Sequence, residues 1–425
     1  MPETNKILII TYYWPPCGGA GVQRWLKFTR YMPENGWKPF VLTVDPAFAQ
    51  YPAIDSSLEK DIHPDTVVHK TKAVNYFKLG GGSSKSVVPG AGFATGSKNI
   101  FSKIARFTRG NLFIPDPRKG WNNHAIKKAV EIIKKEDISY VVTTSPPHST
   151  QLIGLALKKR LPGIKWISDL RDPWTDIYYY REFYGTPPAR AYDKKLERRV
   201  LREADKIITV GNSLASLFME KDASVKEKIS VITNGYDEED FKAGKDLGED
   251  KDLEITYVGS MSDRYPVEPF IEALNSICED RDDFRFRVKI VGSVSPGIKN
   301  MISNYGIIKN FVFLPYCDHA ESVNHVLDSN LLLLLIPDHP MNRIIITGKI
   351  FEYLRSMKPV LCIGPAAGDA SEILIKNKAG NCFNINDISG IKSFILGKHK
   401  MDNNKNEISK FSHRKIVKTL LEEII

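Results

Sequence analysis

Residues 345–372 read IITGKIFEYLRSMKPVLCIGPAAGDASE, and this stretch decides the fold class. In its first half, apolar residues recur at the spacing of one helical face: Ile350, Phe351, Leu354 and Met357. The residues after Pro359 form a short apolar run, typical of a buried strand, which ends in a turn from Gly364 to Gly368. A helix followed by a buried strand and a turn is a repeating unit of α/β folds with parallel sheets.

Polar groups gather at one end of this unit. Thr347-Gly348-Lys349 combines small residues with one cation at the helix N-terminus, where free N–H groups and the helix dipole attract phosphate oxygens. Glu352 lies near the first helical turn on a different face from the apolar residues, and Glu372 follows the later turn. These residues predict a phosphate-binding site. For Glu352 the alternative is an exposed helix carboxylate.

The segment resembles the donor-binding half of a retaining glycosyltransferase with two Rossmann-like domains, the GT-B type. The family is the large GT4-like one (glycosyl transferases group 1), which includes bacterial polysaccharide and lipopolysaccharide enzymes. The resemblance implies that Lys349 holds the diphosphate of a nucleotide sugar and that Glu352 binds the ribose hydroxyls. The family often carries an earlier glutamate, and Ile344 occupies that position here. The implied fold class is α/β, with two doubly wound parallel-sheet domains facing a cleft.

Length and composition indicate a globular protein with two domains. The chain has 425 residues, of which 42% are hydrophobic and 26% charged, and these values disfavour disordered and fibrous proteins. Five cysteines are scattered without a CxxC pair, which argues against a zinc site and a disulfide framework. No Asp-x-Asp follows a predicted strand, so no metal is expected. The resemblance implies a nucleotide-diphosphate sugar as co-substrate and no cofactor.

The pattern of strands and polar runs predicts the domain boundaries. A first, acceptor-binding domain is expected at residues 1–238, a polar linker at 239–252 and a second, donor-binding domain at 253–405. A glycine- and serine-rich loop and a basic amphipathic segment interrupt the first domain at 78–120. The tail at 406–425 is expected to form a helix that packs back on the first domain.

A glycine-rich loop follows the first predicted strand. It contains Gly18, Gly19 and Gly21 and leads into an amphipathic helix predicted from Gln23 to Asn35. Such a loop lets the backbone approach a ligand at the carboxyl end of a strand, and the alternative is a tight strand-to-helix turn. In the family that the chain resembles, a glycine-rich loop at this place faces the donor diphosphate.

The second domain begins with a predicted strand that ends in Gly259 and Ser260. Where the family commonly has an arginine, this sequence continues to Arg264, so a second diphosphate cation would be Arg264 or Arg343. The resemblance places Gly259, Ser260 and Arg264 in the donor site. Further along, the run from Leu331 to Ile336 predicts a strand that is buried on both faces.

Two polar clusters follow predicted strands of the first domain, where doubly wound sheets bind ligands. His148 and Asp172 are therefore predicted to handle the acceptor hydroxyl, as proton carriers or positioning groups, while Lys349 stabilises the leaving diphosphate. The alternatives are that His148 caps the next helix and that Asp169, Arg171 and Asp172 form an ion-pair cluster. Beside Arg171, Asp172 is expected to stay ionised at neutral pH.

Charge suggests an anionic partner, because the formal net charge is +10. Residues 98–109 place four cations beside an apolar stripe, a pattern typical of a helix on an acidic membrane surface; the alternative is that the stripe docks on the domain core. Finger spacings and aromatic RNA-binding motifs are missing, so no nucleic acid is expected. No run reaches about 20 apolar residues, and the start lacks a signal peptide's order, which predicts a cytoplasmic protein, peripheral at the inner face of the membrane.

These expectations combine into one function. The chain is expected to be a hexosyltransferase-like enzyme that transfers a sugar from a nucleotide-diphosphate sugar to a glycan or lipid-linked acceptor in cell-surface polysaccharide biosynthesis. Retention of configuration is implied by the resemblance alone. The alternatives are a nucleotide-sugar epimerase of the same fold and a catalytically silent scaffold that binds sugar nucleotides, which the loss of the acid at Ile344 favours.

Overall fold

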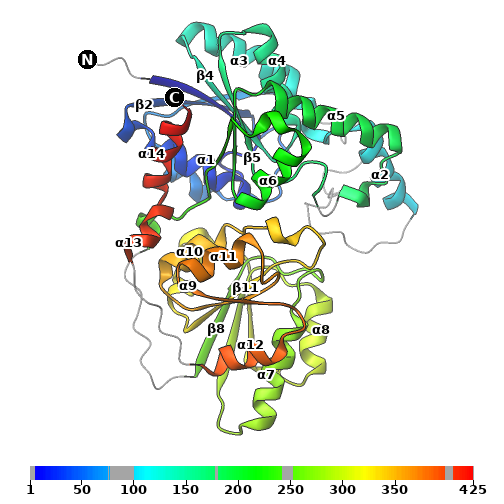
Figure 1. Ribbon diagram of the computed structural model, residues 1–425, viewed down its shortest axis with the longest axis vertical. Coiled ribbons are helices and arrows are strands. Elements are labelled where there is room, and N and C mark those ends of the chain that lie inside the picture. Colours follow the sequence, from blue (N-terminus) through cyan, green and yellow to red (C-terminus); the bar gives the residue numbers. More distant parts are fainter. Residues whose placement is uncertain are drawn as a thin grey trace. The chain divides into compact units, whose positions relative to one another are not determined.

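The computed structural model describes residues 5–74, 76, 100–177, 180–241, 252–397 and 405–424 (Figure 1). The chain divides into two compact units, one made of Met1–Thr233 and His413–Ile425 and the other of Asn234–Ser412. The first unit thus ends five residues before the expected boundary at 238. Most of the expected linker, residues 242–251, lies outside the described residues, and so does most of the glycine- and serine-rich loop, residues 77–99.

The first unit is built on a seven-stranded parallel sheet with the order β3-β2-β1-β4-β5-β6-β7. Its strands are β1 (Asn5–Ile10), β2 (Trp37–Val44), β3 (Val67–Thr71), β4 (Tyr140–Ser145), β5 (Lys165–Leu170), β6 (Lys206–Thr209) and β7 (Ile229–Val231). The order reverses between β1 and β4, which pair with Ile7 opposite Tyr140. In doubly wound sheets this reversal marks the place where ligands bind, beyond the carboxyl ends of the strands.

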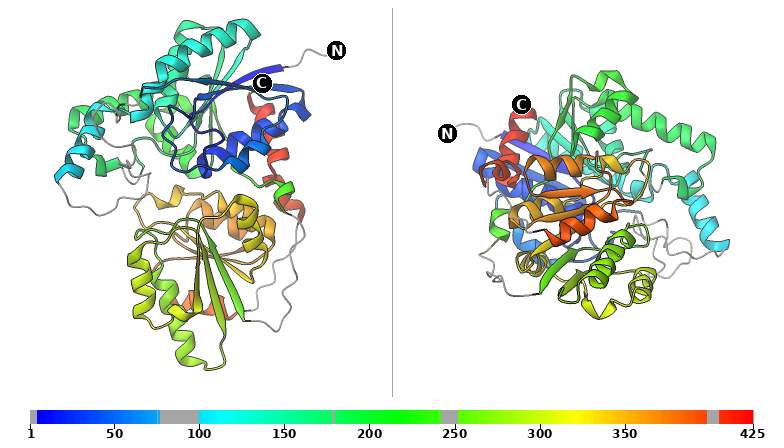
Figure 2. Two further views of the ribbon diagram at one scale, coloured as in Figure 1. Left: turned by 180° about the vertical axis from the view of Figure 1, so that it is seen from behind. Right: turned by 60° about the horizontal axis from the view of Figure 1, so that its bottom comes forward.

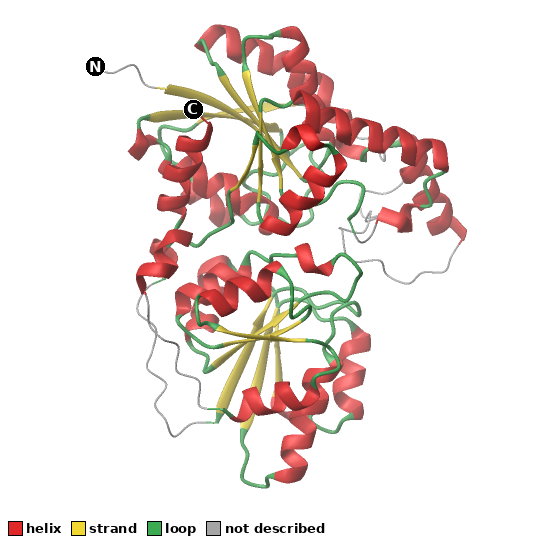
Figure 3. Cartoon of the chain, viewed as in Figure 1, coloured by secondary structure: helices red, strands yellow, loops and turns green. Residues whose placement is uncertain are grey.

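Helices flank both faces of this sheet (Figures 2 and 3). The helices of the first unit are α1 (Ala20–Tyr31), α2 (Ile100–Leu112), α3 (Asn122–Glu136), α4 (Ser149–Arg160), α5 (Pro187–Glu203), α6 (Asn212–Lys221) and α14 (His413–Ile424), of which α2 lies away from the sheet (Figure 1). Strand side chains alternate between the faces: Ile7 and Ile9 pack with α1 and α14, whereas Leu8 and Ile10 pack with α3. The C-terminal helix α14 therefore belongs to the core of the first unit.

Helix α1 begins earlier than its apolar pattern predicts. It starts at Ala20 rather than Gln23, directly after Gly19, whose φ of 90° lies in a region that favours glycine. It ends at Tyr31, and a separate 3₁₀ turn, Pro33–Asn35, covers the rest of the predicted helix. Pro33 explains the break, because proline cannot donate the next α-helical hydrogen bond.

The second unit has a six-stranded parallel sheet with the order β10-β9-β8-β11-β12-β13. Its strands are β8 (Leu253–Val258), β9 (Phe286–Val291), β10 (Phe311–Leu314), β11 (Leu331–Leu335), β12 (Val360–Ile363) and β13 (Gly380–Phe383). Its helices are α7 (Glu268–Asp280), α8 (Pro296–Asn304), α9 (His319–Leu327), α10 (Lys349–Ser356), α11 (Asp369–Lys376), α12 (Ile388–Leu396) and α13 (Lys405–Ile408). Two doubly wound parallel sheets confirm the predicted fold class.

The central strand β11 is buried on both faces, as its leucine run predicts. Leu331, Leu333 and Leu335 pack on one side of the sheet, and Leu332 and Leu334 pack on the other with the apolar face of α10. The predicted helix and buried strand at 345–372 form as α10 and β12, with α11 after the turn.

A buried carboxylate joins three elements of the first unit. Asp169, on β5, is wholly buried and accepts hydrogen bonds from Trp25 Nε1 and Thr144 Oγ1, both at 2.7 Å. Arg24 Nη2 lies 3.3 Å from its other oxygen, and Arg24 Nη1 donates to the carbonyl of Thr233. For Asp169 the structure favours the ion-pair interpretation over a ligand site, because its oxygens face α1 and β4.

Removing this carboxylate should destabilise the fold strongly. Asp169→Ala leaves the Arg24 guanidinium buried beside a void, and losing one partner of a buried ion pair costs about 3–5 kcal/mol. The free energy of unfolding, measured by urea denaturation, should fall by that amount. Asp65→Ala, at a side chain that is 68% exposed, is the control and should stay within about 0.5 kcal/mol of the native chain. Equal stability of both variants would contradict the structural role of Asp169.

Candidate active site

A lysine ammonium occupies the start of α10 in the second unit. Lys349 Nζ donates a hydrogen bond to the Tyr257 hydroxyl at 3.1 Å and lies 4.2 Å from the centre of the Tyr257 ring. Tyr257 is a buried residue of β8, and its hydroxyl donates in turn to the carbonyl of Ser260 at 3.0 Å. The structure therefore brings together Lys349 and Ser260, two of the predicted donor-binding residues.

Gly259 makes room for this ammonium. A Cβ atom added to Gly259 would lie 2.5 Å from Lys349 Nζ, and the residue has a φ of 119°, which side-chain-bearing residues rarely adopt. Burial lowers the pKa of Lys349 to about 8, and the neighbouring Glu352 carboxylate partly opposes this shift. An anion bound beside Nζ would raise the pKa again, because an opposite charge favours the protonated form.

The helix N-terminus offers further polar groups next to the ammonium. Thr347 Oγ1 is buried and has no hydrogen-bond partner among the described residues. Gly348 precedes the first residue of α10, and no side chain caps this helix end. An uncapped helix N-terminus with a cation and an unsatisfied hydroxyl favours an anionic oxygen ligand.

Glu352 has polar neighbours rather than an open helix face. Its Oε1 lies 3.8 Å from His319 Nε2 on α9, and the same nitrogen lies 3.1 Å from Asp240 Oδ2. The Glu352 side chain is 25% exposed, so one side remains accessible to a ligand. The position of the family's earlier acid holds Ile344, which is largely buried in a 3₁₀ turn, Asn342–Ile344. The role of Glu352 at a ribose stays a prediction.

Three other residues that were predicted to contact the donor show fewer contacts with this site. Glu372 pairs with Lys376 one turn along α11, an arrangement that solvated helix surfaces commonly show. Arg264 lies, partly exposed, on the turn after β8, and Arg343 is exposed. Their donor contacts stay predictions.

The glycine-rich loop after β1 is a closely hydrogen-bonded turn. The Gly18 amide donates to the carbonyl of Ala53 at 3.0 Å, and the Gly21 carbonyl accepts from Arg171 Nη1 at 3.1 Å. A Cβ on Gly21 would approach the Tyr13 ring to 3.3 Å. The turn interpretation thus accounts for Gly18 and Gly21, while a diphosphate contact of this loop stays a prediction.

His148 occupies the N-cap position of α4 without capping it. The cap is supplied by Asp116, which accepts from the Ser149 amide at 2.7 Å and from the Ser149 hydroxyl at 2.8 Å. The His148 ring instead stacks on Trp174, with centroids 5.1 Å apart and an interplanar angle of 12°. Both ring nitrogens are buried and lack hydrogen-bond partners among the described residues. Burial lowers the pKa of His148 to about 4, so the ring is neutral at pH 7.

Asp172 does not have the electrostatic setting that the sequence suggests. Arg171 directs its guanidinium to backbone carbonyls, with Nε donating to Ser145 at 2.9 Å and Nη1 to Gly21. Burial raises the pKa of Asp172, and the opposing effect of Arg171 is smaller. Burial therefore outweighs Arg171 in setting the direction of the shift, and the ionised state of Asp172 at neutral pH stays a prediction. A carboxyl with a raised pKa suits proton transfer better than a fully solvated one.

Comparisons with known proteins agree on the fold. A search of curated proteins found no match. A sucrose-phosphate synthase from Thermosynechococcus elongatus has a similar structure, with 13% identity, 98% of each chain covered and a TM-score of 0.63. A glycosyltransferase from Rickettsia africae has 16% identity and a TM-score of 0.63, covering 99% of this chain and 98% of that one. The lipopolysaccharide outer core galactosyltransferase WaaB has 14% identity and a TM-score of 0.60, covering 99% of each chain.

A sequence comparison supports the class of enzyme. Residues 88–240 match the model of Glycosyltransferase Family 4. The chain is a glycosyltransferase with the GT-B fold. Both the recognition and the enzyme class expected from the sequence are thereby confirmed.

A network that the sequence did not reveal holds the loop after β5 of this glycosyltransferase. Trp174 Nε1 and the Tyr180 hydroxyl each donate to Asp193 at 2.8 Å, and the Thr175 hydroxyl donates to Glu197 at 2.6 Å. Burial raises the pKa of Asp193 to about 6. Helical spacing could have indicated this burial, because Asp193 and Glu197 fall on the same helical stripe of α5 as apolar core residues. The Asp193 carboxylate fixes Trp174, on which His148 stacks, and Glu197 fixes the next residue, Thr175.

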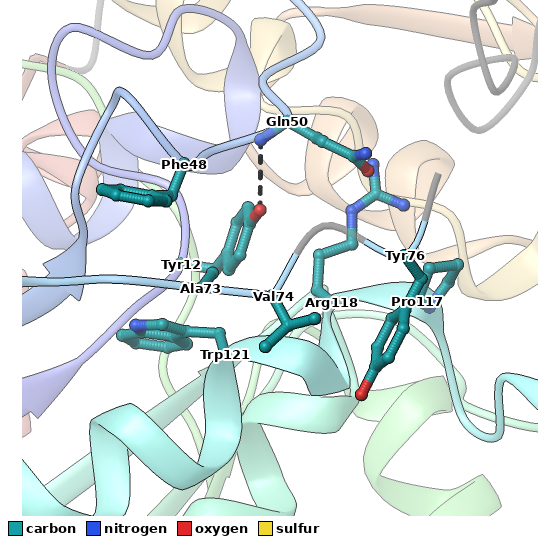
Figure 4. A pocket seen from close by; sticks show the side chains of 9 residues that line it. All are labelled: Tyr12, Phe48, Gln50, Ala73, Val74, Tyr76, Pro117, Arg118 and Trp121. Carbon is teal, nitrogen blue, oxygen red and sulfur yellow. Dashed lines mark hydrogen bonds between the residues drawn. The ribbon is translucent and has the colours of Figure 1, made fainter. Parts of the chain in front are cut away.

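A small hollow in the first unit is too small to hold a sugar. It lies between Tyr12, Gln50, Arg118 and Trp121, where the Tyr12 hydroxyl accepts from the Gln50 amide at 3.1 Å (Figure 4). Its volume of about 10 Å³ holds one water molecule. Burial raises the pKa of Tyr12 to about 12, so its hydroxyl stays protonated. Among the described residues, no group of acidic, histidine or cysteine side chains could hold a metal ion.

The neutral state of His148 predicts a loss of stability in acid. The unfolded chain binds a proton at this residue near pH 6.5, whereas the folded transferase binds it only near pH 4. Between these values the unfolded state holds more protons, so the free energy of unfolding falls as pH falls. His148→Phe keeps an aromatic stack and removes this effect.

Urea denaturation at pH 7 and pH 4.5 measures the effect. The variant should gain about 1–3 kcal/mol relative to the native chain over this interval. Ser303→Ala, on the exposed face of α8, removes no titratable group; it is the control and should keep a constant difference from the native chain. A constant difference for His148→Phe as well would overturn the assignment of His148 as a buried neutral ring.

Proposed function

We propose that this transferase moves a sugar from a nucleotide-diphosphate sugar to a hydroxyl of a glycan or lipid-linked acceptor, without a metal and with retention of configuration. The reaction would serve cell-surface polysaccharide biosynthesis at the cytoplasmic side of the membrane. One observation carries the proposal: the Lys349 ammonium lies at an uncapped helix N-terminus, against the backbone of Gly259. This is a place prepared for a diphosphate.

The proposed chemistry assigns each charge to a group of the chain. As the bond between the sugar's anomeric carbon and the distal phosphate breaks, the electron pair remains on a phosphate oxygen. Lys349 and the N-terminus of α10 stabilise this developing charge. The acceptor oxygen bonds to the anomeric carbon, and its proton passes to a base. Asp172 or His148 would take that proton, or the departing phosphate would.

The acceptor side has groups in suitable states for this step. The two unpartnered nitrogens of neutral His148 can accept or donate a hydrogen bond to a hydroxyl. Asp172 has a raised pKa, which brings a carboxyl closer to the range of an effective general base. The hydrogen bond from Trp174 to Asp193 holds the surface against which the His148 ring is fixed.

Two functions are alternatives to sugar transfer. A nucleotide-sugar epimerase uses no acceptor, and one similar solved structure, with 10% identity and a TM-score of 0.55, is a putative UDP-N-acetylglucosamine 2-epimerase from Listeria monocytogenes. A silent scaffold would bind the donor without turnover, and the apolar Ile344 at the position of the family's first acid favours it. Neither alternative uses an acceptor site around His148.

Donor screening followed by product analysis tests the function. Thermal shift across a set of nucleotide sugars identifies the donor, because a ligand that binds the folded state raises its melting temperature. Incubating that donor with glycan and lipid-linked acceptors should yield nucleoside diphosphate and an extended acceptor. An isomerised donor without acceptor would establish the epimerase, and binding without any product would establish the scaffold.

Lys349 provides the sharpest variant test of the donor side. Lys349→Met should lower turnover about 100-fold or more, since it removes a group that stabilises the leaving phosphate. In the native enzyme the affinity for nucleoside diphosphate should fall as pH rises above about 8, because free Lys349 loses its proton there. The loss is at most about tenfold per pH unit.

Lys349→Arg is the matched control for this titration. A guanidinium stays charged throughout this range, so its affinity should not change between pH 7 and pH 9.5. Isothermal titration with the identified nucleoside diphosphate measures both profiles. Parallel profiles, or normal activity per folded molecule in Lys349→Met, would make Lys349 a structural residue.

Membrane association is proposed on the exposed face of α2. Ile104, Phe107 and Leu112 are 56%, 50% and 67% exposed, beside the cations Lys103 and Arg106. The other side of the helix is anchored, since Asn111 accepts from the Thr186 amide at 2.8 Å and Gly110 packs against the backbone of Phe183. The docking alternative thus applies only to this anchored side. Among the described residues, no helix is long and apolar enough to cross a membrane.

Sedimentation with acidic liposomes tests the α2 surface. Lys103→Glu with Arg106→Glu should reduce pelleting strongly at low salt, since each cation near an anionic surface contributes about 1 kcal/mol. Lys127→Glu with Lys134→Glu, on the exposed face of α3, makes the same change in net charge and is the control. Similar pelleting of both double variants would remove α2 from membrane binding.

A further inference from the structure

Two neighbouring strands of the second unit end in the same three residues. Val258-Gly259-Ser260 ends β8 and Val291-Gly292-Ser293 ends β9, and Val258 pairs with Val291 in the parallel register. Both glycines have positive φ angles, 119° and 129°. The repeated motif therefore places two equivalent turns side by side at the carboxyl edge of the sheet.

Contact between the turns depends on both glycines. The Gly259 amide donates to the carbonyl of Val291 at 2.7 Å, and a Cβ on Gly292 would lie 2.7 Å from the Gly259 carbonyl oxygen. A Cβ on Gly259 would meet the Lys349 ammonium. The β9 turn is thus packed on the β8 turn, and the β8 turn on the cation.

This packing brings two serine hydroxyls together at an accessible position. Ser293 Oγ donates to Ser260 Oγ at 3.0 Å, and both residues are exposed. The backbone supports them, because the Met261 amide donates to the Ser293 carbonyl at 2.8 Å and the Ser295 amide donates back to the Met261 carbonyl at 2.9 Å. Two hydroxyls share one hydrogen bond, so at least one further proton is available to a ligand oxygen.

We propose that Ser260 and Ser293 together bind the distal phosphate of the donor's diphosphate, beside Lys349. This inference rests on the proposed function. The order of groups supports it: Glu352 faces α9, Lys349 contacts β8, and the serine pair lies beyond Lys349 on β8 and β9. With the ribose at Glu352, the groups beyond the cation meet the distal end of the diphosphate.

Hydroxyl donors suit this position chemically. A hydroxyl adds a hydrogen bond to an anionic oxygen without adding a second buried cation next to Lys349. Each such bond strengthens as charge develops on the departing phosphate, so it favours bond breaking over ground-state binding. Ser293 thereby becomes a substrate-binding residue that neither its sequence context nor the glycine beside it had indicated.

Paired nucleotides test which phosphate the serines hold. Affinity is measured by isothermal titration for the nucleoside diphosphate that gives the largest thermal shift among UDP, GDP, ADP, CDP and dTDP, and for the matching monophosphate. Ser260→Ala and Ser293→Ala should each weaken diphosphate binding about tenfold, as expected for a hydrogen bond to a charged group, and leave monophosphate binding unchanged. Ser303→Ala, on exposed α8, is the control.

The outcomes separate this inference from the proposed function. If the native chain binds no nucleoside diphosphate and forms no product, the proposed function itself fails. If the native chain binds but both serine variants bind equally well, the serine assignment fails and the function stands. Equal losses with monophosphate and diphosphate, or a loss seen only with the complete nucleotide sugar, would overturn the distal-phosphate assignment. Melting temperatures of the variants show that each one folds.

Discussion

A lysine ammonium packed against the backbone of a glycine is the contact on which the predicted donor site of this enzyme depends. It fixes the end of β8 relative to the start of α10, because Lys349 and a Cβ on Gly259 cannot occupy the same space. The Tyr257 ring and hydroxyl offset part of the cost of burying the charge. The remaining cost lowers the pKa of the lysine to about 8. An arriving diphosphate would restore the charge that burial weakens.

Local sequence patterns predicted much of the fold. The leucines of β11 and the apolar stripe of α10 each have one stable environment, a sheet interior covered on both faces, so their burial follows from periodicity alone. The position of Lys349 at the start of α10 was predictable for the same reason, because the apolar stripe shows where the helix begins. Boundaries were harder to predict. The early start of α1 depends on the positive φ angle of Gly19, a conformation that a glycine can adopt but need not adopt.

Side-chain partners far apart in the chain could not be predicted in this way. Trp25 and Asp169 are 144 residues apart, and only the packing of α1 across the sheet brings them into a hydrogen bond. Arg171 was assigned to its sequence neighbour, whereas the folded chain offers it the carbonyls of Ser145 and Gly21. The sequence therefore did not reveal that burial raises the pKa of Asp172. The burial of a side chain and the identity of its partner depend on the assembled sheet, so local sequence patterns do not reveal them.

Both halves of the enzyme share one electrostatic feature. Lys349 and His148 have pKa values of about 8 and 4, and burial raises the pKa of Asp172, so each group is shifted toward its neutral form. Burial is the largest cause in all three cases. Groups held in this way respond strongly to a charged or hydrogen-bonding ligand, because water does not compete for them. The desolvation that makes these groups costly to the fold therefore also makes their pKa values sensitive to any ligand that binds beside them.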